Sequence, residues 1–264
     1  MNGYERNNSL LFAGFVALAT AFILAVPAMA GSGVFESFEY EEPLVVGETS
    51  GGEGWSGPWR SDVSLTQPLD LPVVVDKSLD APANLKPVPS GGHFEGSSMI
   101  LCRGLAVGRE IDLSSDQACY ISFLERRSLK GDDKSSTSVA LMLYDKLTSV
   151  IGLGHGSGGK LVVFGSAAAN GTRPAVGFDH TYLWIIKLSE PDAKQMRRAH
   201  ILVYSSTKRF PDREPPVWSL TSEPFPADNF VIDRIRIVMG KNIVLSLDEL
   251  RIGTSWQEVV AAAD

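Results

Sequence analysis

Most apolar segments of this chain are short, rich in β-branched and aromatic residues, and separated by glycine, proline, serine, asparagine or aspartate. This pattern is typical of β-strands joined by turns. The clearest segments cover residues 34–40, 97–107, 117–126, 138–145, 160–165, 181–188, 199–206, 230–238 and 243–253. No long stretch has helical periodicity, and only SWQEVVAA near the C-terminus is expected to form one or two helical turns. We therefore expect an all-β domain.

Two of these segments indicate how the strands are buried. In FVIDRIRIV, Ile235 and Ile237 alternate with Arg234 and Arg236, which predicts a strand with one dry and one wet face. In contrast, TYLWIIKL (181–188) is apolar on both faces apart from its ends, which predicts a central strand covered on both sides. Because no crossover helices are expected, we predict two packed antiparallel sheets in a single domain.

Two long irregular stretches interrupt the strand pattern. Residues 77–96 contain three prolines and a Gly-Gly pair, and residues 207–229 contain five prolines. Both exceed the usual length of a connection between strands. Each is either a functional loop or a long loop at the rim of the domain.

The N-terminus has the layout of a secretory signal. After MNGYERNN come an apolar run of 17 residues (10–26), Pro27 and the triplet AMA at 28–30. A polar start, an apolar middle and a small-x-small end predict a signal peptide over 1–30, cleaved after Ala30, and a β-sandwich domain over 31–264. The alternative is an uncleaved anchor, because 17 residues lie at the lower edge of what spans a bilayer.

Charge argues against a nucleic-acid partner. The chain has a formal net charge of −7, and the predicted cleavage does not change it, because residues 1–30 contain one Glu and one Arg. A nucleic-acid-binding protein needs a basic stripe that neutralises phosphates. The modest acidity is usual for a soluble exported domain that has no membrane contact after cleavage.

Known catalytic and metal-binding motifs are missing from the sequence. No serine has glycines at both the minus-two and plus-two positions, and GHGSGG (154–159) is interpreted as a loop between two strands. The histidines, at positions 93, 155, 180 and 200, have no second histidine or cysteine at ligand spacing. We therefore expect neither an acyl hydrolase nor a zinc site.

Cys102 and Cys119 are the only cysteines. If the segments 97–107 and 117–126 form a hairpin, these residues lie opposite each other, within reach of a disulfide in an oxidising compartment. We predict that bridge. The alternative is two buried thiols.

The C-terminal segment IDRIRIVMGKNIVLSLDELRIGTSW (232–256) resembles the closing strand pair of concanavalin A-like, laminin-G-like domains of exported bacterial proteins. FESFEY followed by GGEGWSGPW resembles the start of the same domains, and YISFLERR and TYLWIIKL resemble their inner strands. The resemblance extends over nearly all of residues 34–257. It implies a jelly-roll sandwich of two antiparallel sheets, and says little about activity.

The same fold hosts laminarinase-type glycoside hydrolases, whose E-x-D-x-x-E strand places paired carboxylates side by side. That motif is missing here, and Asp112, Asp116 and Glu125 are too widely spaced to replace it. We therefore expect a protein that is not an enzyme.

The resemblance further implies a structural calcium site that would tie the two ends of the domain together. Its ligands would be Asp248 and either Glu36 or Glu39, since calcium prefers hard oxygen ligands. The alternative is that Asp248 accepts hydrogen bonds in a metal-free corner.

Trp55 and Trp59 are the candidate ligand-binding residues, within the glycine-rich segment SGGEGWSGPWR (50–60). Tryptophans in such a loop either stack on sugar rings or fill a corner of a sandwich. Their match to recurring positions of the resembling domains favours packing.

The resulting interpretation is a non-catalytic module that binds a polysaccharide or surface glycan and is secreted, periplasmic or attached to the bacterial cell surface. A structural or adhesive protein–protein module is the first alternative. A degenerate or unrecognised glycoside hydrolase or polysaccharide lyase is the second.

Overall fold

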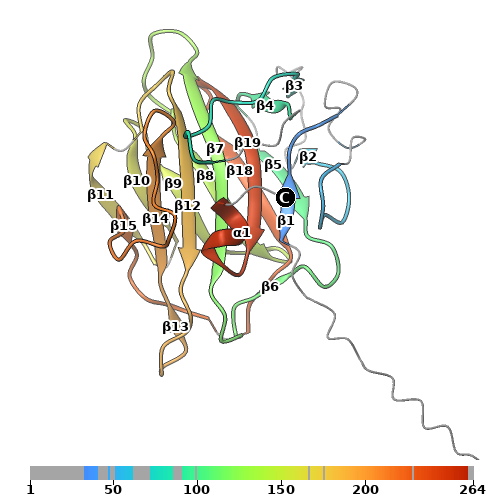
Figure 1. The fold of residues 1–264 in the computed structure, drawn as a ribbon, viewed down its shortest axis with the longest axis vertical. Coiled ribbons are helices and arrows are strands. Elements are labelled where there is room, and N and C mark those ends of the chain that lie inside the picture. Colours follow the sequence, from blue (N-terminus) through green and yellow to red (C-terminus); the bar gives the residue numbers. More distant parts are fainter. Residues whose placement is uncertain are drawn as a thin grey trace, which may run out of the picture. The chain divides into compact units, whose positions relative to one another are not determined.

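Two antiparallel sheets face each other across a shared hydrophobic core (Figure 1). The structure is a computed structural model that describes residues 33–40, 47, 51–61, 72–85, 91–98, 100–165, 167–174, 176–227 and 229–260. The predicted signal peptide, residues 1–30, lies outside the described residues. No helix in the described ranges is long and apolar enough to cross a membrane.

The larger sheet has the strand order β15-β14-β12-β7-β19-β4-β3, and β1 also pairs with β19. Its strands are β1 (Val34–Glu36), β3 (Val73–Val75), β4 (His93–Gly96), β7 (Cys119–Leu129), β12 (Thr181–Leu188), β14 (Ala199–Ser205), β15 (Leu220–Thr221) and β19 (Ile243–Gly253). β4 and β1 pair with the same edge of β19 on either side of a bulge, where Glu249 has a positive φ of 53°.

The smaller sheet has the strand order β11-β10-β9-β8-β18-β5-β2. Its strands are β2 (Arg60–Ser61), β5 (Ile100–Gly104), β8 (Val139–Asp145), β9 (Thr148–His155), β10 (Lys160–Phe164), β11 (Ala169–Pro174) and β18 (Arg234–Met239). Two short pairs complete the fold: β6 (Ile111–Asp112) with β17 (Val231–Ile232), and β13 (Met196–Arg197) with β16 (Phe225–Pro226). The predicted all-β jelly-roll sandwich of two antiparallel sheets is confirmed.

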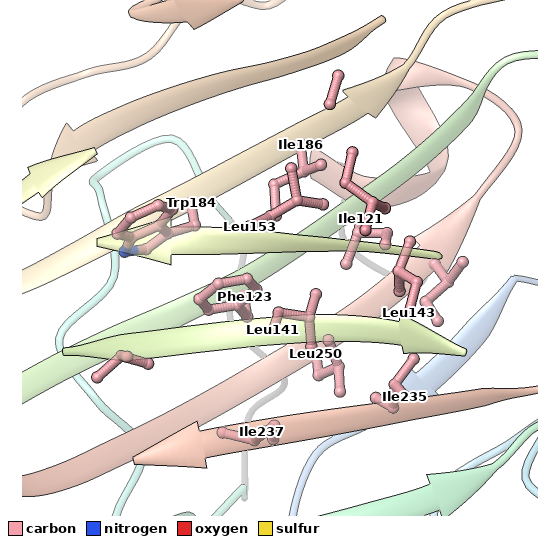
Figure 2. Close-up of a cluster of buried hydrophobic side chains, with 14 of the residues drawn as sticks. Ile121, Phe123, Leu141, Leu143, Leu153, Trp184, Ile186, Ile235, Ile237 and Leu250 are labelled. Carbon is pink, nitrogen blue, oxygen red and sulfur yellow. The ribbon is translucent and has the colours of Figure 1, made fainter. Parts of the chain in front are cut away.

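Side chains from both sheets interleave in the core (Figure 2). Ile235 and Ile237 of β18 are buried there, whereas Arg234 and Arg236 are half-exposed on the other face, so the predicted alternation is confirmed. β12 is TYLWIIKL and lies between β7 and β14. Its side chains are buried on both faces, which confirms the prediction of a central strand.

A covering layer lies over the outer face of the larger sheet. Helix α1 (Trp256–Val260) packs against β7 and β19, as Figure 1 shows, and begins after an N-cap serine, because Ser255 Oγ accepts from the Glu258 amide at 3.4 Å. The two long irregular stretches also meet there, because Asn84 Nδ2 donates to the Phe210 carbonyl at 2.7 Å and Asn84 Oδ1 accepts from the Phe210 amide at 3.1 Å. Apolar residues of α1 and both stretches form a second core with the sheet.

Buried arginines hold the loops at the ends of the sandwich. Arg127 of β7 donates to the carbonyls of Val176 and Thr137 and to Nδ1 of His155 on β9, and His155 Nε2 lies 2.8 Å from Glu125 Oε1. This polar chain joins the two sheets inside the core. Arg197 is fully buried and donates to main-chain carbonyls of the connection before β7.

The predicted hairpin between 97–107 and 117–126 is wrong. Cys102 lies on β5 of the smaller sheet, opposite Arg236, whereas Cys119 lies on β7 of the larger sheet, opposite Leu188. No disulfide joins them. The intervening chain crosses from one sheet to the other: its β6 pairs with β17, and Arg197 binds the Leu113 carbonyl just beyond.

We therefore expect that neither cysteine of the native protein reacts with a thiol reagent, because both are buried and burial raises the pKa of Cys119 to about 12. Unfolding without reductant should expose two reactive thiols. Ellman titration before and after denaturation measures this. An unfolded, unreduced sample without reactive thiols would show that the bridge exists.

Candidate functional site

A row of polar side chains crosses the larger sheet on its outer face. The register places Lys187 of β12 directly opposite Tyr120 of β7 on one side and His200 of β14 on the other, and Thr221 of β15 follows His200. The neighbouring residues along these strands point into the core, so this row points outward. We call Tyr120, Lys187, His200 and Thr221 the Lys187 row.

Two carboxylates contact the amine of Lys187. Its Nζ lies 3.0 Å from Glu214 Oε1, on the loop after β14, and 3.7 Å from Glu190 Oε2, just after β12. Tyr120 donates its hydroxyl proton to Glu214 Oε2 at 2.5 Å, and the Lys187 amine lies 5.3 Å from the centre of the Tyr120 ring. The side chain of Lys187 is 14% exposed and that of Glu190 55% exposed, so the cluster opens to solvent at one edge.

The pKa values in the row follow from burial and these contacts. Burial, together with the hydrogen bond to Glu214, raises the pKa of Tyr120 to about 12. Burial lowers the pKa of Lys187, but its bonds with Tyr120 and Glu214 outweigh that and raise it above the ordinary value. Burial and the neighbouring Lys187 charge lower the pKa of His200. At neutral pH Tyr120 is therefore a neutral phenol, Lys187 a cation and His200 a neutral imidazole, and Tyr120 is buried beneath the covering layer at 5% exposure.

Trp218 provides an aromatic ring beside this row. It lies on the loop after β14 and is half-buried. The centre of its ring is 5.3 Å from that of His200, and it meets Trp256 of α1 edge-on at 6.4 Å. The indole is held in place by these two neighbours and remains partly accessible. An anchored aromatic ring beside a hydroxyl, an amine and carboxylates can hold a small polar ligand with apolar faces.

The predicted ligand-binding tryptophans lie elsewhere. Trp59 is only 1% exposed, stacks on Phe38 and donates from Nε1 to Glu36 Oε2 at 3.3 Å. Its prediction as a sugar-stacking residue is wrong, because the core has no room for a ligand at its ring. Trp55 is half-buried and donates to the Phe35 carbonyl at 3.0 Å, with Arg103 4.8 Å from its ring centre. The corner-filling alternative describes Trp59.

The predicted calcium ligands have other partners. Glu36 forms a buried ion pair with Arg103 and accepts a hydrogen bond from the Tyr40 hydroxyl at 2.8 Å. Asp248 accepts hydrogen bonds from the backbone amides of Leu79 and Glu249, at 2.9 and 2.7 Å.

Burial and the neighbouring Glu249 carboxylate raise the pKa of Asp248 to about 7, which disfavours the charged form that calcium needs. Glu39 is exposed just beyond β1. Within the described ranges, no group of three or more His, Cys, Asp or Glu residues could hold a metal ion. The arrangement of Glu36, Glu39 and Asp248 therefore gives no support to the predicted calcium site.

Sequence reasoning missed Trp218, Glu214 and the Lys187 row. One signal is present in the sequence: a tryptophan inside the long proline-rich stretch 207–229, for which both a functional loop and a rim loop are predicted alternatives. Lys187 and His200 lie at the ends of two correctly predicted strands. Their pairing depends on a register that the sequence alone does not give.

No family model matches the chain, and a search of curated proteins also found no match. Solved structures match weakly. The binding domain of botulinum neurotoxin serotype C1 is 12% identical, with a TM-score of 0.41, over 69% of this chain and 44% of its own. Lectin II from Ulex europaeus is 8% identical, with a TM-score of 0.41, over 70% of this chain and 98% of its own. The chain spans less than half the length of the neurotoxin domain, and likeness at this level assigns no family.

Proposed function

We propose that this protein is an exported, non-catalytic β-sandwich module that binds a polysaccharide or surface glycan at the Lys187 row. One observation carries the proposal: Trp218 is fixed beside the Lys187 row, where the Lys187 amine and the carboxylates of Glu190 and Glu214 meet at an edge open to solvent. The predicted signal peptide would place the mature protein outside the cytoplasm, in the periplasm, at the cell surface or in the medium.

The chemistry of a sugar ring fits this set of groups. A pyranose has an apolar C–H face, which packs on an aromatic ring, and hydroxyl groups that both donate and accept hydrogen bonds. Lys187 donates, Glu190 and Glu214 accept, and Thr221 and His200 can do either. Ligand sites of this kind combine a hydrophobic surface with a few fixed polar groups.

The hydrolase alternative is disfavoured by the position of Lys187. A glycosidase of either stereochemistry needs one of its two carboxyl groups protonated as general acid. Here a single ammonium group contacts both Glu190 and Glu214, and Glu214 also accepts a hydrogen bond from the Tyr120 hydroxyl. Both carboxylates are therefore already engaged by side chains of the protein, an arrangement better suited to holding a ligand than to cleaving one.

A glycan array probed with the purified protein, with and without calcium, tests the proposal. We expect binding to at least one glycan class that does not depend on calcium. Incubation with the bound polysaccharide should release neither reducing sugar nor unsaturated product. Absence of binding across the array would contradict the proposal. If the protein cleaves the polysaccharide and Glu190→Gln or Glu214→Gln abolishes that cleavage, the protein is an enzyme and the proposal is wrong.

A further inference from the structure

The outer face of the smaller sheet carries a second set of potential ligand contacts. Alternate residues of β18 and β8, among them Ile237 and Leu141, point into the core, so their neighbours Arg236 and Met142 point outward. Arg60, Arg234 and Tyr144 point outward by the same alternation. We call the outward positions of β2, β5, β18, β8, β9 and β10 the open face.

Three arginines lie close together on this face. The register places Arg60 of β2 and Arg236 of β18 on either side of Cys102 of β5. Arg234 lies two residues before Arg236 on the same face of β18. Arg236 is oriented by Tyr144, with its Cζ 4.2 Å from the ring centre and Nη1 donating to the hydroxyl at 3.0 Å. Arg60 and Arg234 form no ion pair with any residue that the structure describes.

Among the residues that the structure describes, acidic side chains are segregated from this face, although the chain as a whole carries a formal net charge of −7. Where side chains are described, no Asp or Glu occupies an outward position on these strands. The nearest in sequence are Asp145, the last residue of β8, and Asp233, just before β18, which accept backbone hydrogen bonds from Val231 and Lys146. The open face therefore concentrates positive potential on an acidic protein.

The apolar side chains of the open face project little from the sheet and are half-buried. Gly152 of β9 has no side chain, and a β-carbon there would collide with Met142 Sδ, so Met142 lies across β9. The large hydrophobic residues that are strongly exposed elsewhere in the described chain, such as Val107 and Leu147, do not belong to this face. An acidic protein partner would bury large exposed apolar groups at its centre. The surface is better suited to a charged polymer.

We infer that the open face is a second binding surface, specific for an acidic polysaccharide that carries carboxylate or sulfate groups. The planar guanidinium groups of Arg60, Arg234 and Arg236 match the oxygens of such anions in a bidentate geometry. This surface lies on the opposite sheet from the Lys187 row and does not depend on the glycan-binding proposal made for that row.

Binding of the purified protein to immobilised polygalacturonate, dextran sulfate and unmodified dextran tests this inference. We expect binding to at least one of the two acidic polymers and none to dextran. The variant Arg60→Gln/Arg234→Gln, which leaves Arg236 and Tyr144 in place, should bind about tenfold or more weakly, since about 1.4 kcal/mol is a factor of ten. Binding should also fall when salt is raised from about 0.1 M to about 1 M, where the Debye length shrinks from about 10 to about 3 Å.

A matched control removes the same charge from exposed positions outside the open face, with Arg126→Gln/Arg209→Gln. That variant should bind within about twofold of the wild type if the site is local. Equal losses in both variants, or binding unaffected by either, would overturn the inference. So would self-association or binding to poly-L-glutamate that depends on Arg60 and Arg234 while both acidic polysaccharides fail to bind. Trp218→Ala should leave this binding unchanged, which separates it from the Lys187 row.

Discussion

Replacing Arg103 with methionine is expected to lower the free energy of unfolding by about 3–5 kcal/mol, the usual cost of leaving a buried charge without its partner. The Arg103 side chain is 1% exposed and its Glu36 partner 0% exposed. The guanidinium also donates to the carbonyls of Gly57 and Gly51, at 2.7 and 2.6 Å. The substitution therefore leaves a buried carboxylate and removes the anchor of the glycine-rich loop.

Urea unfolding of the wild type and Arg103→Met measures the loss. Arg109→Met is the matched control, because Arg109 is 30% exposed and lies 4.0 Å from Glu53, a pair expected to contribute at most about 1 kcal/mol. Adding Glu36→Gln to Arg103→Met should recover part of the loss, since a neutral amide is cheaper to bury than a carboxylate. If Arg103→Met costs no more than Arg109→Met, the corner is not held by this ion pair.

Trp218→Ala is expected to weaken glycan binding by about 2 kcal/mol, which corresponds to about 30-fold in Kd. The indole is the largest apolar surface beside the Lys187 row, and its packing against Trp256 and His200 orders it before the ligand arrives. Pre-ordering reduces the entropy lost on binding. Isothermal titration with the best glycan of the array gives the change in affinity.

Trp55→Ala is the control for this prediction, because Trp55 of the glycine-rich loop packs against Arg103 and does not contact the Lys187 row. It should lower the melting temperature and leave the Kd within about twofold, since it removes packing and no ligand contact. Trp218→Phe should retain part of the affinity by keeping an aromatic ring. If Trp55→Ala instead loses affinity and Trp218→Ala keeps it, the glycan binds at the glycine-rich loop and not at the Lys187 row.

The strands could be predicted from the sequence because each one is specified locally. TYLWIIKL predicted β12 with both its bounds, and the alternation of Ile235 and Ile237 with the flanking arginines predicted the two faces of β18. β9 was missed because Gly152 and Gly154 interrupt its pattern. Close contacts require both glycines: a β-carbon at Gly154 would collide with the Val139 carbonyl.

Pairing between distant strands could not be predicted, and the site depends on it. The hairpin proposed for the cysteines assumed that strands consecutive in sequence are neighbours, whereas β5 and β7 lie in different sheets. Tyr120, Lys187 and His200 meet only because β7, β12 and β14 pair in one particular register. Glu214 and Trp218 join them from a loop whose path follows from packing against α1 and the outer face of the sheet.

Hydrogen–deuterium exchange with and without the best-binding glycan tests the central claim most directly, because it locates the ligand without altering the protein. The proposed site predicts slower exchange in peptides that cover residues 181–190, 199–206 and 214–221, which contain the Lys187 row except Tyr120, together with Glu214 and Trp218. Ligand contact and the ordering of the loop both reduce local opening. Protection confined to residues 51–61 or to the open face, with none in these three segments, would contradict it.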